Sequence, residues 1–320
     1  MRWTWLVVGV ALIALGFGAW QLRSRYIRSD GGARVEVPLP PVTATPALLL
    51  PAPDPGLVAN SPDGPLPIIG KDGRQVWRVY GRPFDAADTR PRIALVVTGL
   101  GLDHALSQAA LDRLPGAVTL AFDPYADDLK NAFNQARTLG HETLLGLPME
   151  PLDYPRQDPG PLTLLASLPD DQNIRRLNKL MGSGSGYVGF VALWGGRFLT
   201  DKTAPLPILE TLKERGLMLV DNRPPAENAT ARLAGQIKLP WAAADFALDN
   251  EAEPNAIDQA LASLETQAQR NGVALGIAAL SPALLDHVAT WVATLSGKGL
   301  ALAPASAVAN RQSTAPVAAQ

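Results

Sequence analysis

Arg92 to Leu102 reads RIALVVTGLGL, and this stretch decides the fold. The apolar run from Ile93 to Val97 is followed by a glycine-rich break, a pattern typical of a buried parallel strand that runs into a loop. In parallel α/β folds, the functional groups follow the carboxyl ends of the strands. The residues that follow this strand are Thr98 and Gly99. Neither can act as a carboxylate ligand or as a base.

The chain continues this alternation of strand-like and helix-like segments to about residue 304. We expect strands at 93–98, 118–122, 143–147, 187–192, 217–220, 241–248, 273–279 and 300–303. We expect helices at 103–114, 126–139, 170–181, 205–215, 255–271 and 282–295, with another opening at Pro224. Seven or eight βα units without an internal repeat favour a barrel-like parallel sheet inside a layer of helices. A doubly wound open sheet is the alternative, and periodicity does not separate the two.

Bulk composition limits the function classes. The chain has 320 residues, of which roughly 220 fall in one large α/β domain, enough for a well-buried core. A net charge of -2 with 18% charged residues leaves no basic face, so we expect no nucleic-acid partner. The absence of cysteine excludes disulfides and thiolate metal sites.

Residues 1–29 are predicted to be an N-terminal membrane anchor. Between residues 3 and 22 the only polar side chains are Thr4 and Gln21, and about 20 apolar residues span one bilayer core of roughly 30 Å. A cleavable signal peptide is the rival, but no small-x-small site precedes Arg23. The positive-inside rule, applied to the arginines on the two sides of the segment, only slightly favours a cytoplasmic location for the rest of the chain.

The predicted domain is flanked by segments of biased composition. Residues 30–91 are rich in proline and are expected to form an extended tether without a packed core. Within the tether, the alternating segment QVWRVY at 75–80 is either the start of a strap, residues 75–84, lying against the domain, or a patch of linker. The folded α/β domain is expected at 92–304, and residues 305–320 are expected to be a disordered tail.

No motif in the sequence predicts a metal or a cofactor. His104, His141 and His287 are far apart and away from strand ends, so we expect surface or helix-packing residues. The pair Gly99 and Gly101 lacks the third glycine and the acidic residue of a dinucleotide-binding loop.

Polar and aromatic residues nevertheless recur just after the predicted strands. In a barrel these residues converge on one mouth, where they could hydrogen-bond sugar hydroxyls or an acidic partner. The alternative is that the carboxylates cap helices and tie loops through ion pairs. The candidate binding residues are Asp123, Glu150, Trp194, Arg197, Asp221, Arg223, Asp249 and Asn250.

Several segments from about Arg92 to Ala309 resemble the divergent polysaccharide deacetylase family. LGHETLLGLPMEP, residues 139–151, is the most specific of them, and RIALVVTGLGLD, VGFVALWGGRFLTD and LKERGLMLVDNRP agree in order and spacing. The resemblance implies a bacterial envelope protein with a distorted (β/α) barrel of the polysaccharide deacetylase type.

The same resemblance implies a metal held by an aspartate and histidines, but the matching positions are substituted. Thr98 and Gly99 stand where family members usually have two aspartates. Gly146, Leu193 and Ala279 stand where the resemblance implies histidines. Apart from the threonine hydroxyl, these side chains have no lone pair to offer, so we expect no bound metal and a pseudoenzyme.

The sequence therefore predicts a catalytically inactive, deacetylase-like protein held in the bacterial inner membrane by residues 3–22. Its domain is expected in the periplasm, binding cell-wall glycan or an envelope protein. One rival is an active polysaccharide deacetylase that uses a non-standard site, for example Asp221 and Asp249 as acid and base. Another is a regulator that faces the cytoplasm.

Overall fold

The computed structural model describes residues 49–224, 229–248 and 255–312. The chain divides into two compact units, residues 1–43 and 44–320, and all described residues belong to the second. Among the helices of these described residues, none has the length and apolarity needed to cross a membrane. The predicted anchor and its apolar run, residues 3–22, lie outside the described residues.

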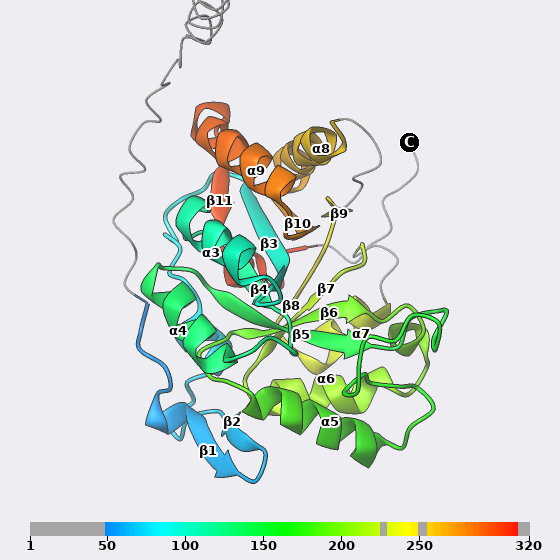
Figure 1. Ribbon diagram of the computed structural model, residues 1–320. Helices are drawn as coiled ribbons and strands as arrows, with labels where there is room; N and C mark the ends of the chain where they lie inside the picture. Colours follow the sequence, from blue (N-terminus) through cyan, green and yellow to red (C-terminus); the bar gives the residue numbers. More distant parts are fainter. Residues whose placement is uncertain (1–48, 225–228, 249–254, 313–320) are drawn as a thin grey trace, which may run out of the picture. The chain divides into compact units, whose positions relative to one another are not determined.

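A nine-stranded sheet forms the centre of the described unit (Figure 1). Its strands are β3 (Arg92–Leu100), β4 (Thr119–Phe122), β5 (Thr143–Met149), β6 (Gly189–Trp194), β7 (Met218–Asp221), β8 (Trp241–Ala243), β9 (Phe246–Ala247), β10 (Val273–Ala279) and β11 (Ala301–Ala303). Their order is β8-β7-β6-β5-β4-β3-β10-β9, and β11 pairs with the start of β3. All these pairings are parallel, so the carboxyl ends of the strands share one edge.

One continuous run of chain links the two ends of this sheet. β8 pairs with β7, and two residues later β9 pairs with β10. Between them, the amide of Ala244 donates to the carbonyl of Asp221 at 2.8 Å, and the amide of Asp245 donates to Leu275 at 2.8 Å. The sheet therefore curls into a distorted (β/α) barrel, as predicted, and the doubly wound alternative is wrong.

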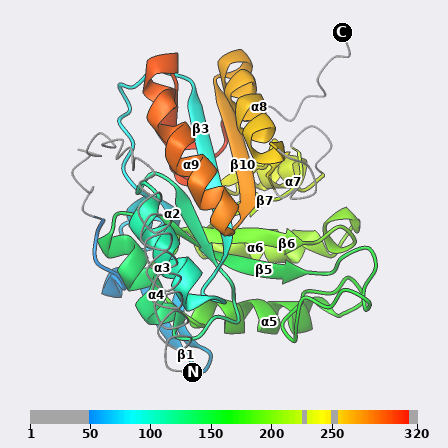
Figure 2. The ribbon, with the colours of Figure 1, turned by 45° about the horizontal axis from the view of Figure 1, so that its top comes forward.

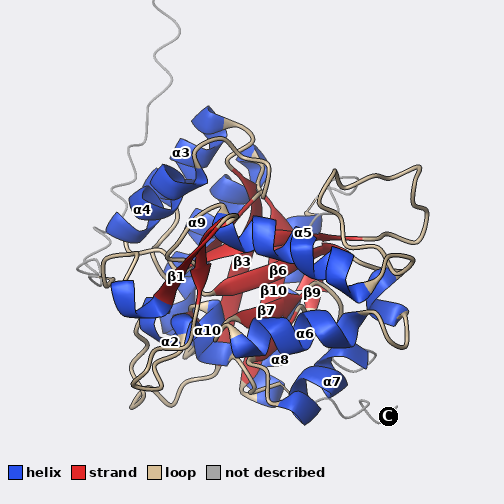
Figure 3. Cartoon of the chain, turned by 90° about the horizontal axis from the view of Figure 1, so that it is seen from below, coloured by secondary structure: helices blue, strands red, loops and turns tan. Residues whose placement is uncertain are grey.

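Helices surround the strands, as the end-on view in Figure 3 shows. They are α3 (His104–Arg113), α4 (Leu129–Thr138), α5 (Asp170–Gly182), α6 (Pro205–Glu214), α7 (Ala229–Ile237), α8 (Ala256–Asn271) and α9 (Pro282–Leu295). In Figure 2, α8 and α9 lie side by side over β3 and β10. Side-chain caps mark where some of these helices begin. At α3 the Asp103 side chain accepts from the Leu106 amide at 2.9 Å, and at α9 Ser281 is the cap just before Pro282.

Apolar strand residues fill the barrel. Ile93 to Val97 are fully buried, which confirms the interior strand predicted from their sequence. A series of aromatic contacts joins the strands to the helix layer. Successive rings in the order Phe122, Phe133, Tyr187 and Phe190 have centroids 5.2 to 5.6 Å apart.

The proline-rich stretch differs from the extended tether that its composition predicts. Its described part, residues 49–91, contains an antiparallel pair, β1 (Val58–Ser61) and β2 (Gly64–Pro67), and a short helix, α2 (Val76–Tyr80). β2 packs against α5, and Gly182 approaches so closely that a Cβ there would lie 1.9 Å from the Asp63 carbonyl oxygen. Tertiary contacts with the barrel therefore order a segment that proline keeps extended in isolation.

The predicted strap does lie against the domain, but as a helix. Val76, Trp77 and Tyr80 are buried and fall on one face of α2. The alternation in QVWRVY was a misleading signal for a strand, because a segment of six residues is short enough to match both the strand period and the helix period.

The expected disordered tail is also partly ordered, because Ala305–Val308 form the short helix α10, with Ala305 and Val308 buried. Beyond it, Asn310 and Gln312 bond to β8: the Gln312 side chain accepts from the Ala243 amide and donates to the Ala243 carbonyl, both at 2.7 Å. These amide side chains stand in for a neighbouring strand at an otherwise open edge of β8. Residues 313–320 lie outside the described residues.

Candidate functional site

The carboxyl edge of the sheet brings several of the predicted site residues together. Asp123 follows β4, Glu150 follows β5, Trp194 ends β6 and Asp221 ends β7. These four strands are consecutive neighbours, and Trp194 is the register partner of Met149. The expected convergence on one mouth therefore holds for these four positions. Asp249 and Asn250 lie outside the described residues.

Glu150 is buried and ties loops together. Its Oε2 accepts from the Ala166 amide at 2.7 Å, and its Oε1 lies 3.4 Å from Nε of Arg197. Its carbonyl also accepts from the Arg197 and Phe198 amides, at 3.1 and 3.2 Å. The long loop after β5 is thereby held against the loop after β6. This is the structural role that carboxylates at strand ends commonly play.

Asp221 has a similar local role. It is 2% exposed and accepts from the Arg223 guanidinium at two positions, 3.1 and 2.9 Å, and from the Arg223 amide at 3.1 Å. Arg223 Nη2 also donates to the Thr230 hydroxyl at 3.0 Å, which connects the end of β7 to α7. With its oxygens occupied by Arg223, this carboxylate is poorly placed to serve as an acid or base.

Asp123 is the mouth carboxylate with no ion pair among the described residues. It is half-buried, and burial raises the pKa of its carboxyl group, while a hydrogen bond from the Tyr125 amide, 2.9 Å away, acts in the opposite direction. Tyr125 in turn accepts from the Leu162 amide at 3.0 Å, so its ring rests on the loop after β5. Tyr125 is a mouth residue absent from the candidates predicted from the sequence, because after β4 only Asp123 was singled out.

The positions that the resemblance assigns to a metal do not fit one. Thr98 and Ala279 are register partners, and the Thr98 hydroxyl donates to the Ala278 carbonyl at 3.3 Å. A Cβ at Gly146 would lie 2.6 Å from Cδ1 of Leu193 and 3.0 Å from Cδ of Pro124. The space that a histidine side chain needs at Gly146 is therefore filled by hydrocarbon. Gly99 has open space but a φ of +84°, which disfavours any replacement.

The three histidines do not compensate for the missing ligands. His104 is exposed at the start of α3, and Nδ1 of His287 lies 2.6 Å from the Asp258 carboxylate on the outer helices. His141 is 1% exposed and bonds to the Val118 carbonyl, so it is a core residue rather than a surface or helix-packing one. Within the described part of the chain, no three His, Asp or Glu side chains gather in a way that could hold a metal ion.

Exposed apolar side chains form a rim around the mouth. Leu102 follows β3, Tyr125 follows β4, Leu152 follows β5 and Trp194 ends β6, with exposures of 63%, 37%, 76% and 46%. Four adjacent strands thus each present a large apolar side chain to solvent at the same edge. Clustered exposure of this kind marks interaction sites more often than scattered surface residues do.

Trp194 is the most unusual member of this rim. Its φ of +58° is a left-handed conformation that costs a residue other than glycine on the order of 1 kcal/mol or more. Two hydrogen bonds hold this conformation in place. The Asn222 side chain donates to the Trp194 carbonyl at 3.2 Å, and the Gly195 amide donates to the Met149 carbonyl at 3.2 Å. Asn222 is a second site residue that the sequence analysis missed.

Comparison with known proteins agrees with this architecture. A family model described as divergent polysaccharide deacetylase matches residues 95–309. An uncharacterized protein of Agrobacterium tumefaciens C58 is 37% identical with a TM-score of 0.72, and the match covers 77% of this chain and 99% of that chain. A protein of Enterococcus faecalis V583, proposed to be a cellobiose-phosphate cleavage protein, is 12% identical with a TM-score of 0.48 over 69% of this chain and 99% of that one. No curated protein matches the chain. The family match, the relative from Agrobacterium and the curled barrel together establish that the chain belongs to the divergent polysaccharide deacetylase family.

Proposed function

We propose that this protein is a catalytically inactive member of its family that binds envelope glycan at the carboxyl-end mouth of the barrel. In this proposal residues 3–22 anchor it in the inner membrane and the barrel lies in the periplasm. The exposed, conformationally strained Trp194 carries the proposal, because backbone strain persists only where the surrounding structure holds it and such strain clusters at ligand-binding sites.

The lack of hydrolytic activity is inferred from the mouth chemistry. Metal-dependent deacetylation needs a bound cation that polarises the acetyl carbonyl and activates water. At the five positions implied for that cation, the only oxygen or nitrogen donor on a side chain is the Thr98 hydroxyl, and it is already bonded to a carbonyl. Leu193 fills the space beside Gly146. The mouth is thus better suited to packing against a ligand than to binding a cation.

The choice of a glycan rests on the combination of groups at the rim. Tyr125 and Trp194 present flat apolar rings, which can pack on the C–H faces of a sugar. Beside them, Arg197 has a side chain that is 58% exposed, and Asp123 is half-buried. These side chains can donate to and accept from sugar hydroxyls. Apolar faces with a few polar groups are the usual composition of small-ligand sites.

Binding to glycan is tested with the full-length protein in detergent and insoluble cell-wall sacculi in a co-sedimentation assay. Trp194→Ala is expected to weaken binding about tenfold, equivalent to about 1.4 kcal/mol, because one stacked ring is lost. Leu139→Ala is the matched control, since Leu139 is 42% exposed but precedes β5 at the opposite end of the barrel. Equal binding by both variants and the unaltered protein would contradict a glycan site at the mouth.

Inactivity is tested separately on acetylated glycan with added zinc, together with measurement of bound metal. The proposal predicts no acetate release and no stoichiometric metal. Turnover with one tightly bound metal per chain would refute it and support the active-enzyme alternative.

An envelope protein is the second candidate partner, and the exposed leucines favour it. Leu102 and Leu152 are 63% and 76% exposed on the same rim, and aliphatic side chains are more typical of protein interfaces than of sugar sites. This candidate predicts no binding to sacculi. It also predicts that replacing both leucines with serine abolishes cross-linking of the full-length protein to an envelope protein, while Leu139→Ser has no effect.

A further inference from the structure

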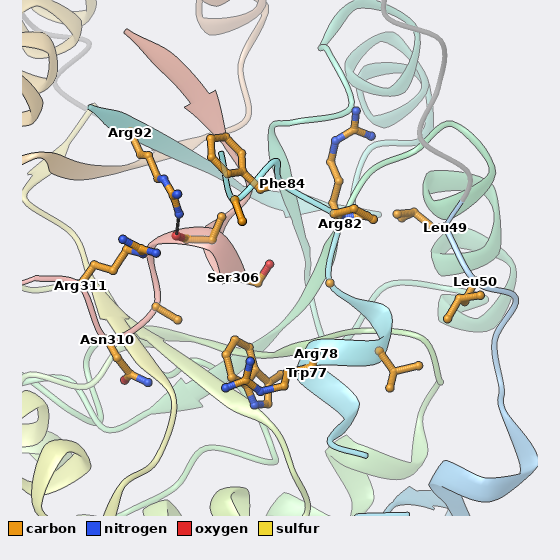
Figure 4. Close-up of a pocket in the computed structure, with 16 residues that line it drawn as sticks. Leu49, Leu50, Trp77, Arg78, Arg82, Phe84, Arg92, Ser306, Asn310 and Arg311 are labelled. Carbon is orange, nitrogen blue, oxygen red and sulfur yellow. Dashed lines mark hydrogen bonds between the residues drawn. The ribbon is translucent and has the colours of Figure 1, made fainter. Parts of the chain in front are cut away.

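A concave site lies at the opposite end of the barrel from the carboxyl-end mouth. It is a cleft of about 630 Å³ formed by residues 77–92 and 306–311, with Leu49 and Leu50 at its edge (Figure 4). The starts of β3 and β8 adjoin it, through Arg92 and through the bond from the Asn310 amide to the Trp241 carbonyl, 2.7 Å. Its size is in the range of small-ligand sites.

Four arginines line this cleft: Arg78, Arg82, Arg92 and Arg311. None of them forms an ion pair with a carboxylate among the described residues, although six other arginines do. Figure 4 shows Arg92 and Arg311 on one wall and Arg82 on the other. We refer to this site as the arginine cleft.

Two of the guanidinium groups are oriented by aromatic rings. Arg78 lies over Trp77 at 4.4 Å from the ring centroid, and Arg92 lies over Phe84 at 4.3 Å. Stacking occupies the face of a guanidinium but leaves its N–H edges available. Arg92 uses one of its donors on the Ala307 carbonyl at 2.9 Å, and Arg82 uses Nη1 on the Gly140 carbonyl at 2.6 Å. The remaining donors can bind a ligand in the cleft.

Nearby acidic groups only partly offset this positive charge. Glu142 is fully buried behind the cleft and accepts from the Arg82 amide at 3.1 Å and from the Ser306 hydroxyl and amide. Burial raises the pKa of this carboxyl group. Asp88 is paired with Arg90 at 2.6 Å. Even with Glu142 ionised, the four arginines leave an excess of about three positive charges by the usual assignment of one per guanidinium.

We propose that the arginine cleft binds a phosphate-bearing ligand. Arginine forks match the oxygens of phosphate and carboxylate alike, but a single carboxylate neutralises only one of the cleft's guanidinium groups. A phosphate or diphosphate group carries more negative charge and more acceptor oxygens, so it can engage several arginines at once. The phosphate can belong to a soluble compound or to a lipid headgroup.

Binding is tested by isothermal titration calorimetry on the full-length protein in detergent with three probes. Inorganic pyrophosphate represents the soluble source, short-chain phosphatidylglycerol represents the lipid source, and acetate is the carboxylate control. Saturable one-site binding of pyrophosphate or of the lipid is expected, and whichever binds identifies the source. Acetate is expected to bind at least about tenfold more weakly, since it accepts fewer hydrogen bonds.

Variants connect this binding to the cleft. Arg311→Ala is expected to weaken phosphate binding at least about tenfold, and its side chain is exposed with no described hydrogen bond, so folding is unaffected. Arg92→Lys retains the charge and is expected to lose less affinity than Arg92→Ala. Arg270→Ala is the matched control, because Arg270 is an exposed arginine in the last turn of α8.

Three outcomes would overturn the proposal: no binding of either phosphate probe, equal binding of acetate, or equal affinity of Arg311→Ala and Arg270→Ala. Trp194→Ala, at the other end of the barrel, is expected to leave phosphate binding unchanged. Failure at the arginine cleft and failure at the glycan mouth are therefore distinguished.

Discussion

Arg137 holds the segment from Leu50 to Tyr80 against the barrel, and its removal should cost a large part of the protein's stability. Its side chain, 5% exposed, extends from α4, and Nη1 donates to the carbonyls of Tyr80 at 3.0 Å and Gly186 at 2.9 Å. Nη2 donates to the carbonyl of Leu50, and the guanidinium lies 4.9 Å from the Tyr80 ring centroid. One side chain thus joins three segments distant in sequence.

Arg137→Ala leaves the Tyr80 carbonyl without its side-chain donor, whereas the Gly186 carbonyl keeps a hydrogen bond from the Thr143 hydroxyl at 3.3 Å. The Tyr80 bond is buried, and a buried acceptor left unpaired costs about 1–3 kcal/mol, while the lost bond to Gly186 adds on the order of 1 kcal/mol. Leu50 is 58% exposed, so water can replace its bond. The expected loss is therefore about 2–4 kcal/mol of unfolding free energy, the sum of one unpaired buried carbonyl and one lost hydrogen bond from a charged group. Burial lowers the pKa of Arg137 to about 10, so the group is still charged at pH 7.

Urea unfolding followed by tryptophan fluorescence measures this loss. Arg137→Lys retains a charge but has a single ammonium in place of the fork, so it should recover only part of the stability. Arg113→Ala is the control, because the Arg113 pair with Asp286 is exposed and should contribute less than about 1 kcal/mol. A loss for Arg137→Ala no larger than that for Arg113→Ala would refute the role given to Arg137.

Two further predictions concern the mouth and the core. Gly146→Ala should cost about 1–3 kcal/mol of unfolding free energy, because the new Cβ would lie 2.6 Å from Leu193 Cδ1. In a double-mutant cycle, Leu193→Ala should remove most of that cost, and strictly additive losses would contradict the packing argument. Burial lowers the pKa of His141, so the folded state disfavours its protonation, and its contribution to stability is present above the unfolded pKa of about 6.5 and lost as the pH falls below it. The stability of His141→Gln relative to the unaltered protein should therefore rise between pH 7 and pH 5, measured by urea unfolding, whereas exposed His104→Gln should run parallel to the unaltered protein throughout.

The candidate site could be predicted in part from the sequence. Polar residues after β4, β5, β6 and β7 could be placed on one edge because parallel strands share a direction. What those residues contact could not be predicted. Asp221 pairs with a neighbour two positions away, and that contact is suggested by the sequence, whereas the contact of Glu150 with Ala166 depends on how the loop after β5 folds back. The left-handed φ of Trp194 has no signal in the sequence at all.

The sequence by itself determined the alternation of strands and helices, the buried central strand and which side chains stand at the positions where the resemblance implies metal ligands, because periodicity and side-chain chemistry are local properties. Only the tertiary structure decided that the sheet curls until the run from β8 to β9 joins its two ends, and that residues 49–91 and 305–312 are ordered. It also decided that four arginines from the two ends of the described chain share one cleft. The physical reason is the same in each case: hydrogen bonds and burial between segments far apart in sequence provide the free energy that orders them, and no local pattern encodes such a pairing.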